Sequence, residues 1–294
     1  MSRRLDGVVR RCYASAVAQG ALLFTESTVH KRNELGVEFE VRYVPALAAK
    51  PSTKPSEKQS AKDFVNPFQP YDERLHVATL GGASHNLLLN KYCVVPHHLL
   101  ITTATFQRQG ERLGEADFAA ALDTVDGLAR EQIVFYNSGE ESGASQPHKH
   151  MQVLPMPEDM DEPPSTLLWL RSSSPPGQVH TADILPFAHF GVRLASGRLS
   201  PSGLTAAYTA ALGELARIHG PDASYNMVMT RSAIMLFPRR QSSWHGISIN
   251  SLGFAGLLLC KTREEQALLD SVGILHALTH VGFPRLDRTT PCSC

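Results

Sequence analysis

The chain contains 294 residues, which is long enough for one large domain or two ordinary ones with an ample core. Its 28 lysines and arginines balance 28 aspartates and glutamates, so no overall charge favours a nucleic-acid or membrane partner, and an anionic substrate must be held by local groups. Five scattered cysteines, never spaced Cys-x-x-Cys, argue against a disulfide framework or a cysteine zinc site and favour a reducing compartment.

The N-terminal segment is predicted to form a core helix. Apolar residues recur at helical spacing from Leu5 to Ala16, so we expect a helix over residues 4–24 rather than a targeting peptide. A strand is expected over residues 37–44. Residues 48–62 are rich in proline, serine and lysine, which predicts a mobile loop whose lysines are either solvated or able to cover a polyphosphate.

The middle of the chain alternates between apolar runs and turn-forming residues. Residues 86–103 predict strands on either side of Pro96. A one-sided apolar stripe predicts a helix over 114–131, and a strand is expected over 133–136. The loop 137–147 then leads into an extended segment that begins at His148.

The second half begins after a segment rich in proline and serine. We predict an N-terminal part (1–165), a Pro/Ser-rich linker (166–183) and a C-terminal part (184–294). The elements expected in the C-terminal part are helices over 202–219 and 262–279 and strands over 225–230, 234–237 and 247–249. This order of elements predicts an α+β fold, and the longest apolar run, 252–260, is too short to cross a bilayer.

The most informative segment is the run from Gly143 to Gln152. In an extended chain, side chains alternate between two faces, so His148, His150 and Gln152 share one face, whereas Lys149 and Met151 point to the other.

The two histidines have three possible roles: metal ligands, catalytic groups, or buried side chains satisfied by backbone groups. No third ligand stands at a matching position nearby, which argues against zinc. The small-residue loop Ser142 to Ser145 can bring backbone N–H groups close to a phosphate, which favours phosphoryl or nucleotidyl chemistry.

The residue types at this site favour group transfer. A neutral imidazole nitrogen can attack phosphorus and carry the transferred group, provided that its other nitrogen is oriented by an acceptor such as a backbone carbonyl. The Gln152 amide can donate a hydrogen bond to a phosphate oxygen but cannot deliver a proton. Such a site favours a leaving group that departs as an anion and capture by a second phosphate over hydrolysis.

The segment His148-Lys149-His150-Met151-Gln152 resembles the His-x-His-x-Gln signature of the transferase branch of the histidine-triad superfamily. Its flanks resemble the fungal-type diadenosine tetraphosphate phosphorylases (ATP adenylyltransferases). Further matching segments are Asn90-Lys91-Tyr92, Val94-Val95-Pro96, Asn137-Ser138-Gly139, Ser224-Tyr225-Asn226, Met229-Thr230-Arg231, Phe237-Pro238-Arg239 and residues 250–256. The resemblance implies a histidine-triad-like fold with an antiparallel sheet, flanking helices and both halves in one chain.

The resemblance also implies a nucleotidyltransferase that phosphorolyses diadenosine tetraphosphate to ATP and ADP through a covalent adenylyl-histidine. His150 would be the nucleophile, Gln152 would hold the transferred phosphate, and His148 would orient either group. Contacts with the nucleotide and polyphosphate are implied for Lys50, Asn90, Lys91, Asn137, Ser142, Gly143, Ala144, Ser145, Asn250, Ser251, Leu252, Leu257 and Lys261.

Structural roles remain open for several of these residues. Lys50 and Lys91 can be simply solvated, and Asn250 can cap a helix that starts at Ser251. The stem of Lys261 can cover apolar core while its ammonium group reaches solvent. The alternative functions are a nucleotide-binding sensor without turnover and a sugar-1-phosphate nucleotidyltransferase.

The expected partners are small molecules: a dinucleoside polyphosphate, ATP, ADP and inorganic phosphate. We expect a divalent cation, Mg²⁺, held by the substrate phosphates and not by a protein cage. No nucleic-acid or membrane partner is expected. A monomer is expected because one chain supplies both halves, and the reducing compartment indicated by the cysteines is the cytoplasm or the nucleus.

Overall fold

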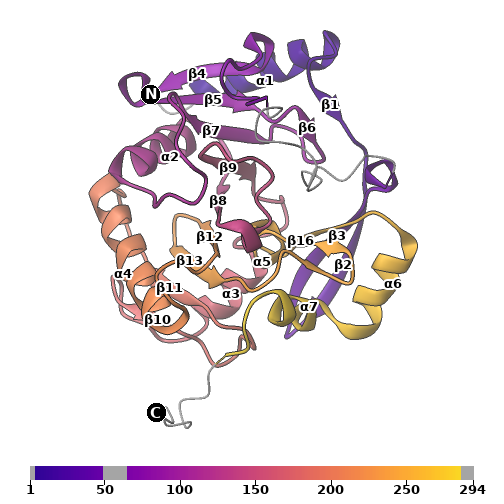
Figure 1. The fold of residues 1–294 in the computed structure, drawn as a ribbon, viewed down its shortest axis with the longest axis vertical. Coiled ribbons are helices and arrows are strands. Elements are labelled where there is room, and N and C mark those ends of the chain that lie inside the picture. Colours follow the sequence, from indigo (N-terminus) through magenta and orange to yellow (C-terminus); the bar gives the residue numbers. More distant parts are fainter. Residues whose placement is uncertain (1–3, 49–64, 286–294) are drawn as a thin grey trace.

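A large antiparallel sheet forms the centre of the computed structural model, which describes residues 4–48 and 65–285 (Figure 1). The sheet has nine strands in the order β10-β11-β13-β12-β8-β9-β7-β5-β4, and every neighbouring pair is antiparallel. The strands are β4 (His76–Leu80), β5 (His85–Leu89), β7 (Leu99–Thr103), β8 (Gln132–Ser138), β9 (His150–Pro155), β10 (Val179–His180), β11 (Phe190–Arg193), β12 (Tyr225–Met229) and β13 (Ala233–Pro238). The expected α+β architecture with an antiparallel sheet is confirmed.

The two halves of the chain meet inside this sheet. Strand β8 from the first half pairs with β12 from the second, with Ser138 opposite Tyr225 and Val134 opposite Met229. The hydrogen-bonded ladder is therefore continuous between the predicted N-terminal and C-terminal parts. Their division at residues 165 and 184 stays a prediction.

Helices and a smaller sheet cover the central sheet on its two faces (Figure 1). One core cluster includes buried side chains of α1 (Arg4–Ala18), α2 (Glu115–Gly127) and α4 (Pro201–His219). The other includes residues of the three-stranded sheet β16-β3-β2 and of the remaining helices. These elements are β2 (Thr28–Glu34), β3 (Val37–Tyr43), β16 (Leu257–Cys260), α3 (Pro164–Leu170), α5 (Ser251–Phe254), α6 (Arg263–Val272) and α7 (Ile274–Val281).

Short strand pairs complete the described architecture. Strand β1 (Leu23–Phe24) pairs with β6 (Tyr92–Cys93) in parallel, and β14 (Ser243–Trp244) pairs with β15 (Ile247–Ser248) in antiparallel orientation. Within residues 4–48 and 65–285, no helix has the length and apolarity needed to cross a membrane.

The structure corrects several predicted elements. The first helix ends at Ala18 instead of residue 24, and the single helix expected over 262–279 is two helices separated by Gly273, whose φ is +97°. Helix α3 (Pro164–Leu170) spans the predicted boundary at residue 165, and its Trp169 is fully buried and donates from Nε1 to the His180 carbonyl. Residues 49–64, which include Lys50 and most of the predicted lysine-rich loop, lie outside the described residues.

Candidate active site

Strand β9 carries His150 and Gln152 of the histidine motif in the interior of the sheet, between β7 and β8, and His148 lies just before it. His150 pairs with Thr102, and Gln152 pairs with Leu100 on one side and Phe135 on the other. Met151 and Val153 belong to the core cluster beneath helices α1, α2 and α4. His150 and Gln152 therefore project from the opposite face of the strand, as the period-two alternation predicts.

The His150 imidazole is held in one tautomer. Its Nδ1–H donates to the backbone carbonyl of His148 at 2.8 Å, because a carbonyl oxygen can only accept. Burial lowers the pKa of His150 to about 4, so the ring is neutral at physiological pH. The Nε2 lone pair has no hydrogen-bond partner among the described residues, and it is the atom available for attack.

His148 is a structural neighbour of His150. Its Nε2–H donates to the Thr103 carbonyl at 2.9 Å, and its Nδ1 accepts from the Asn66 side-chain amide at 2.9 Å. The Phe68 ring lies against both imidazoles, at centroid distances of 5.7 Å from His148 and 5.2 Å from His150. Both nitrogens of His148 have hydrogen-bond partners, and its backbone carbonyl accepts from the His150 ring.

Gln152 is oriented by a histidine that the sequence analysis did not select. The His98 Nε2–H donates to Gln152 Oε1 at 2.9 Å, and His98 Nδ1 accepts from Asn90 Nδ2 at 3.0 Å. The Asn90 oxygen in turn accepts from the Tyr92 backbone N–H at 3.2 Å. With its oxygen used in this way, the Gln152 amide leaves its NH₂ group for oxygen atoms of a phosphate.

A polar hub ties the loop before the motif to the second half of the chain. Asn137 Oδ1 accepts from Asn226 Nδ2 at 2.9 Å and from Ser251 Oγ at 2.7 Å. The Ser142 carbonyl accepts from Asn226 Nδ2 at 2.8 Å and from the Arg239 guanidinium at 3.3 Å. Burial lowers the pKa of Arg239 to about 9, yet the side chain stays charged near neutral pH. The buried positive charge of Arg239 therefore lies in contact with the loop before the motif.

A pocket of about 160 Å³ lies beside this loop. Five residues selected from the sequence line it: Gly143, Asn250, Leu252, Leu257 and Lys261. They come from both halves of the chain, and His150 is not among the lining residues. Asn250 caps helix α5 by accepting from the Leu252 N–H at 2.9 Å, which confirms that it acts as a helix cap.

Other selected residues lie apart from this pocket or are used internally. The Lys91 ammonium lies 5.7 Å from the centroid of the Tyr92 ring, and the Lys91 side chain is exposed. Ser142 Oγ donates to the Gly139 carbonyl at 2.6 Å and accepts from the Ala144 N–H at 3.3 Å. Ser145 is exposed. The structure thus defines two groups, one around His150 and one around the pocket, joined by the hub of Asn137.

Three supporting residues were missed by sequence reasoning. Besides His98 and Asn66, Gln109 bridges the strands by donating to the Asn137 carbonyl at 2.8 Å and accepting from the His150 N–H at 2.8 Å. His98 follows Pro96 just before a strand, so the sequence could predict its position at a strand end. It could not predict that His98 would contact Gln152. Nothing in the sequence around Asn66 or Gln109 indicates their distant partners.

A second buried histidine provides an internal comparison. His189 Nδ1–H donates to the carbonyl of Phe187, two residues earlier, at 2.8 Å, and burial lowers its pKa to about 4. Its Nε2, however, accepts from the Ala182 N–H at 2.8 Å. The backbone contact and burial are the same as in His150, but the second nitrogen of His189 is not free.

The chain was compared with known families and structures. Residues 2–168 match the Ap4A phosphorylase N-terminal domain, and residues 183–284 match the ATP adenylyltransferase C-terminal domain. The chain is 29% identical to diadenosine tetraphosphate phosphorylase 2 of Saccharomyces cerevisiae, over 95% of this chain and 94% of the relative.

Solved structures of a yeast protein have the same fold. Crystal structures of yeast Ap4A phosphorylase Apa2 in complex with Ap4A and with AMP each superpose with a TM-score of 0.84 at 28% identity. The superposition covers 98% and 99% of this chain, respectively, and 100% of each crystallised chain.

Proposed function

The chain belongs to the Ap4A phosphorylase family, and from this premise we propose that it cleaves diadenosine tetraphosphate with inorganic phosphate to give ATP and ADP. It is a nucleotidyltransferase with a histidine-triad-like fold, and its ligands are small nucleotides. The residue roles, the cation and the location in the cell form the finer part of the proposal.

The first step forms a covalent intermediate on His150. The Nε2 lone pair attacks an α-phosphorus, a P–N bond forms, and the P–O bond to the remaining triphosphate breaks so that ATP leaves as an anion. The ring then carries a positive charge, which the Nδ1–H donation to the His148 carbonyl stabilises. The Gln152 NH₂ group, aimed by His98, donates to a non-bridging oxygen in the transition state.

The second step returns the histidine to its neutral form. An oxygen of inorganic phosphate attacks the same phosphorus, the P–N bond breaks, and ADP is released. No proton donor is required at either leaving group, because each departs as a stable anion or as the neutral imidazole. The amide at position 152 suits this double displacement.

The pocket and the hub are proposed to hold the rest of the substrate. The apolar walls of the pocket, with Leu252 and Leu257, suit a nucleoside, and Lys261 adds a positive charge to the pocket lining. We propose that the polyphosphate passes along the loop from Ser142 to Ser145 and along Asn137, Asn250 and Ser251, because Gly143 and Asn250 line the pocket and Gln109 links Asn137 to His150. Asn90, Lys50 and Lys91 complete the proposed contacts, with Lys50 outside the described residues.

A divalent cation is proposed to accompany the polyphosphate. Within the described residues, no group of three His, Cys, Asp or Glu side chains could hold a metal ion. These residues do not fit a resident metal, so no step is assigned to the ion, and we infer that Mg²⁺ enters with the substrate phosphates. Turnover should therefore depend on free Mg²⁺ while the protein alone binds none by calorimetry; tight binding to the free protein would contradict this.

The remaining expectations concern the setting of the enzyme. We propose a monomer, because a single chain completes the sheet through the β8–β12 pair, and light scattering would measure it directly. A reducing compartment, the cytoplasm or the nucleus, is supported by the free thiols of Cys12, Cys93 and Cys260. Fractionation of cells that express the tagged chain tests the compartment, and recovery from a secretory compartment would contradict it.

The observation that carries the proposal is the neutral Nε2 of His150, which has no partner among residues 4–48 and 65–285, close to the Gln152 amide. Mixing the protein with diadenosine tetraphosphate without phosphate should add the mass of AMP, and adding phosphate should remove it as ADP. His150→Ala should abolish both events, whereas His276→Ala, which changes an exposed histidine on α7, should not. Turnover that survives in His150→Ala would rule out this nucleophile.

A further inference from the structure

A buried lysine, Lys149, lies next to His150 in the sequence and has no part in the proposed chemistry. The Lys149 side chain, just before β9, is 5% exposed and points toward helix α2. Its ammonium group donates to Asp117 Oδ2 at 2.8 Å, to the Arg112 carbonyl at 2.9 Å and to Gln107 Oε1 at 3.3 Å. All three N–H bonds of the ammonium are therefore used.

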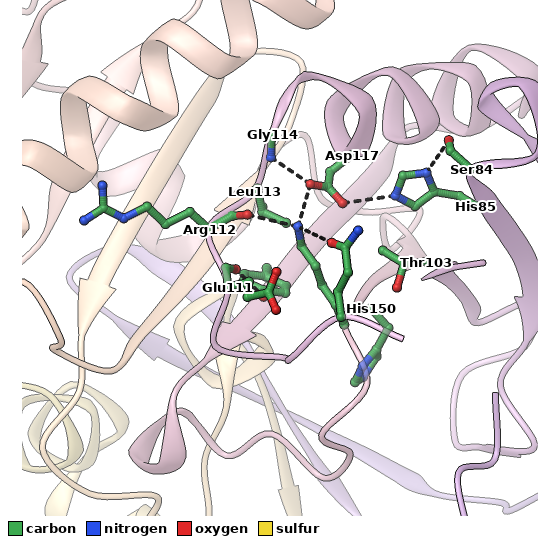
Figure 2. A network of polar contacts seen from close by, with 12 residues as sticks. Ser84, His85, Thr103, Glu111, Arg112, Leu113, Gly114, Asp117 and His150 are labelled. Carbon is green, nitrogen blue, oxygen red and sulfur yellow. Dashed lines mark hydrogen bonds and ion pairs between the residues drawn. The ribbon is translucent and has the colours of Figure 1, made fainter. Parts of the chain in front are cut away.

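Asp117, in the first turn of α2, is the counter-ion of this lysine. Its other oxygen accepts from His85 Nε2 at 3.0 Å, and Ser84 Oγ lies 2.9 Å from His85 Nδ1 (Figure 2). The Gly114 N–H also donates to Asp117, at 2.7 Å. Burial alone would raise the pKa of Asp117, but the hydrogen bonds from His85, Gly114 and Lys149 lower it overall, so the carboxylate is ionised.

One peptide group links this buried pair to the nucleophile. The Lys149 N–H donates to the Gln107 carbonyl at 2.8 Å, and the His148 carbonyl of the same peptide accepts from His150 Nδ1–H at 2.8 Å. In a planar trans peptide the N–H and C=O point in opposite directions. Whatever anchors the N–H on one side therefore aims the carbonyl on the other.

The same loop forms hydrogen bonds with the Lys149 ammonium and with the backbone of His150. Gln107 and Arg112 lie in this loop, and Gln109 between them bonds the His150 backbone N–H at 2.8 Å. The ammonium thus connects three points: helix α2 through Asp117, the loop backbone at Arg112 and the side chain of Gln107.

We propose that Lys149, held by Asp117, is a positioning residue that fixes the His148–Lys149 peptide and with it the tautomer and direction of the His150 ring. A buried ion pair contributes little net stability, because the desolvation of two charges offsets their attraction, and apolar replacements are often neutral. What the ion pair adds beyond packing is a fixed direction of the His148–Lys149 peptide group. The inference rests on the proposed function, in which His150 Nε2 is the nucleophile.

The test compares Lys149→Met, Asp117→Asn and the double variant, which removes both charges and leaves no unpaired buried ion. Lys149→Met and the double variant should lower kcat by about 10²-fold, the cost of a small misplacement of a reacting group, with KM changed by less than about twofold. The double variant should regain the thermal stability lost in Lys149→Met without regaining kcat. Lys31→Met, which breaks exposed ion pairs of Lys31 with Glu38 and Asp159, is the matched control and should retain full turnover.

A spectroscopic readout separates positioning from stability. Nitrogen-15 NMR of labelled histidines, with the His150 signals identified by their loss in His150→Ala, should report the Nδ1–H tautomer in the wild type and a mixture in the double variant. The proposal is overturned if the double variant restores kcat or keeps a pure Nδ1–H tautomer. Turnover in His150→Ala would instead overturn the proposed function, so the two failures are distinguishable.

Discussion

At the scale of single residues, His150 differs from the buried His189 in its Nε2, which has no hydrogen-bond partner in the part of the chain that the structure describes. His189 has the same i−2 carbonyl contact and a pKa also lowered to about 4, but the Ala182 N–H occupies its Nε2. Burial and tautomer are thus shared by a residue with no free lone pair. The proposed role of His150 as nucleophile rests on its Nε2, which has no partner among the described residues, and on the nearby Gln152 amide.

The lowered pKa of His150 predicts the pH dependence of the first half-reaction. A neutral nucleophile is needed, and His150 takes up a proton only near pH 4, so the rate of adenylylation should stay constant as pH falls from about 8 to about 6. Single-turnover mixing without inorganic phosphate measures this step alone. A decline with a midpoint near the ordinary histidine value would contradict the burial argument.

Sequence reasoning identified the motif residues because their relation is local. The alternation that places His150 and Gln152 on one face needs only the strand period. His98 and Asn66 could not be identified, because their partners lie far away in the chain and no periodicity encodes such pairs. The contacts of the other selected residues with substrate stay predictions.

At the scale of elements, the contact between β11 and α3 allows a direct test of packing. A Cβ atom at Gly191 would lie 2.4–2.8 Å from atoms of the Trp169 indole, a fully buried side chain. Gly213 is a solvent-exposed position in the middle of α4, and a Cβ atom there would have nothing within 4 Å. The two glycines therefore respond in opposite ways to the same added methyl group.

We predict that Gly191→Ala destabilises the protein by about 1–3 kcal/mol or more through overpacking, whereas Gly213→Ala stabilises it by about 0.5–1 kcal/mol through helix propensity. Urea denaturation of both variants measures the free energy of unfolding. If Gly191→Ala unfolded at the wild-type midpoint, α3 could not be packed on β11 as described.

Elements with a strong apolar period were predictable, and those without it were not. Helix α4 matches its prediction within a residue, whereas β2 was missed, because its sequence from Thr28 to Glu34 is mostly polar and exposed. The last helix was predicted as continuous, because its apolar stripe runs past Gly273. Tertiary pairing with β3 defines β2, and no local pattern carries that information.

At the scale of the whole molecule, buried neutral histidines should make stability depend on pH. The pKa values of His98, His150 and His189 are each lowered from 6.5 to about 4 by burial. Between pH 6.5 and pH 4 the unfolded chain binds more protons than the folded chain. The contribution of these histidines to the free energy of unfolding is therefore fully present above pH 6.5 and is lost as pH drops toward 4. Each histidine accounts for roughly 3 kcal/mol over this interval.

Together the three histidines should therefore offset much of a typical folding free energy before pH 4 is reached. We predict that the urea midpoint is nearly constant from about pH 8 to about pH 7 and declines steadily below about pH 6. A midpoint that stayed level down to about pH 5 would mean that these side chains take up protons in the folded state.

The pairing of β8 with β12 also has a consequence for how the chain is made. Strand β8 emerges from the ribosome long before β12, and until then its outer edge has no partner in the sheet. Open, apolar edges of this kind attract other strands. During synthesis the first half therefore exposes a pairing edge that its own fold covers only once β12 has been made.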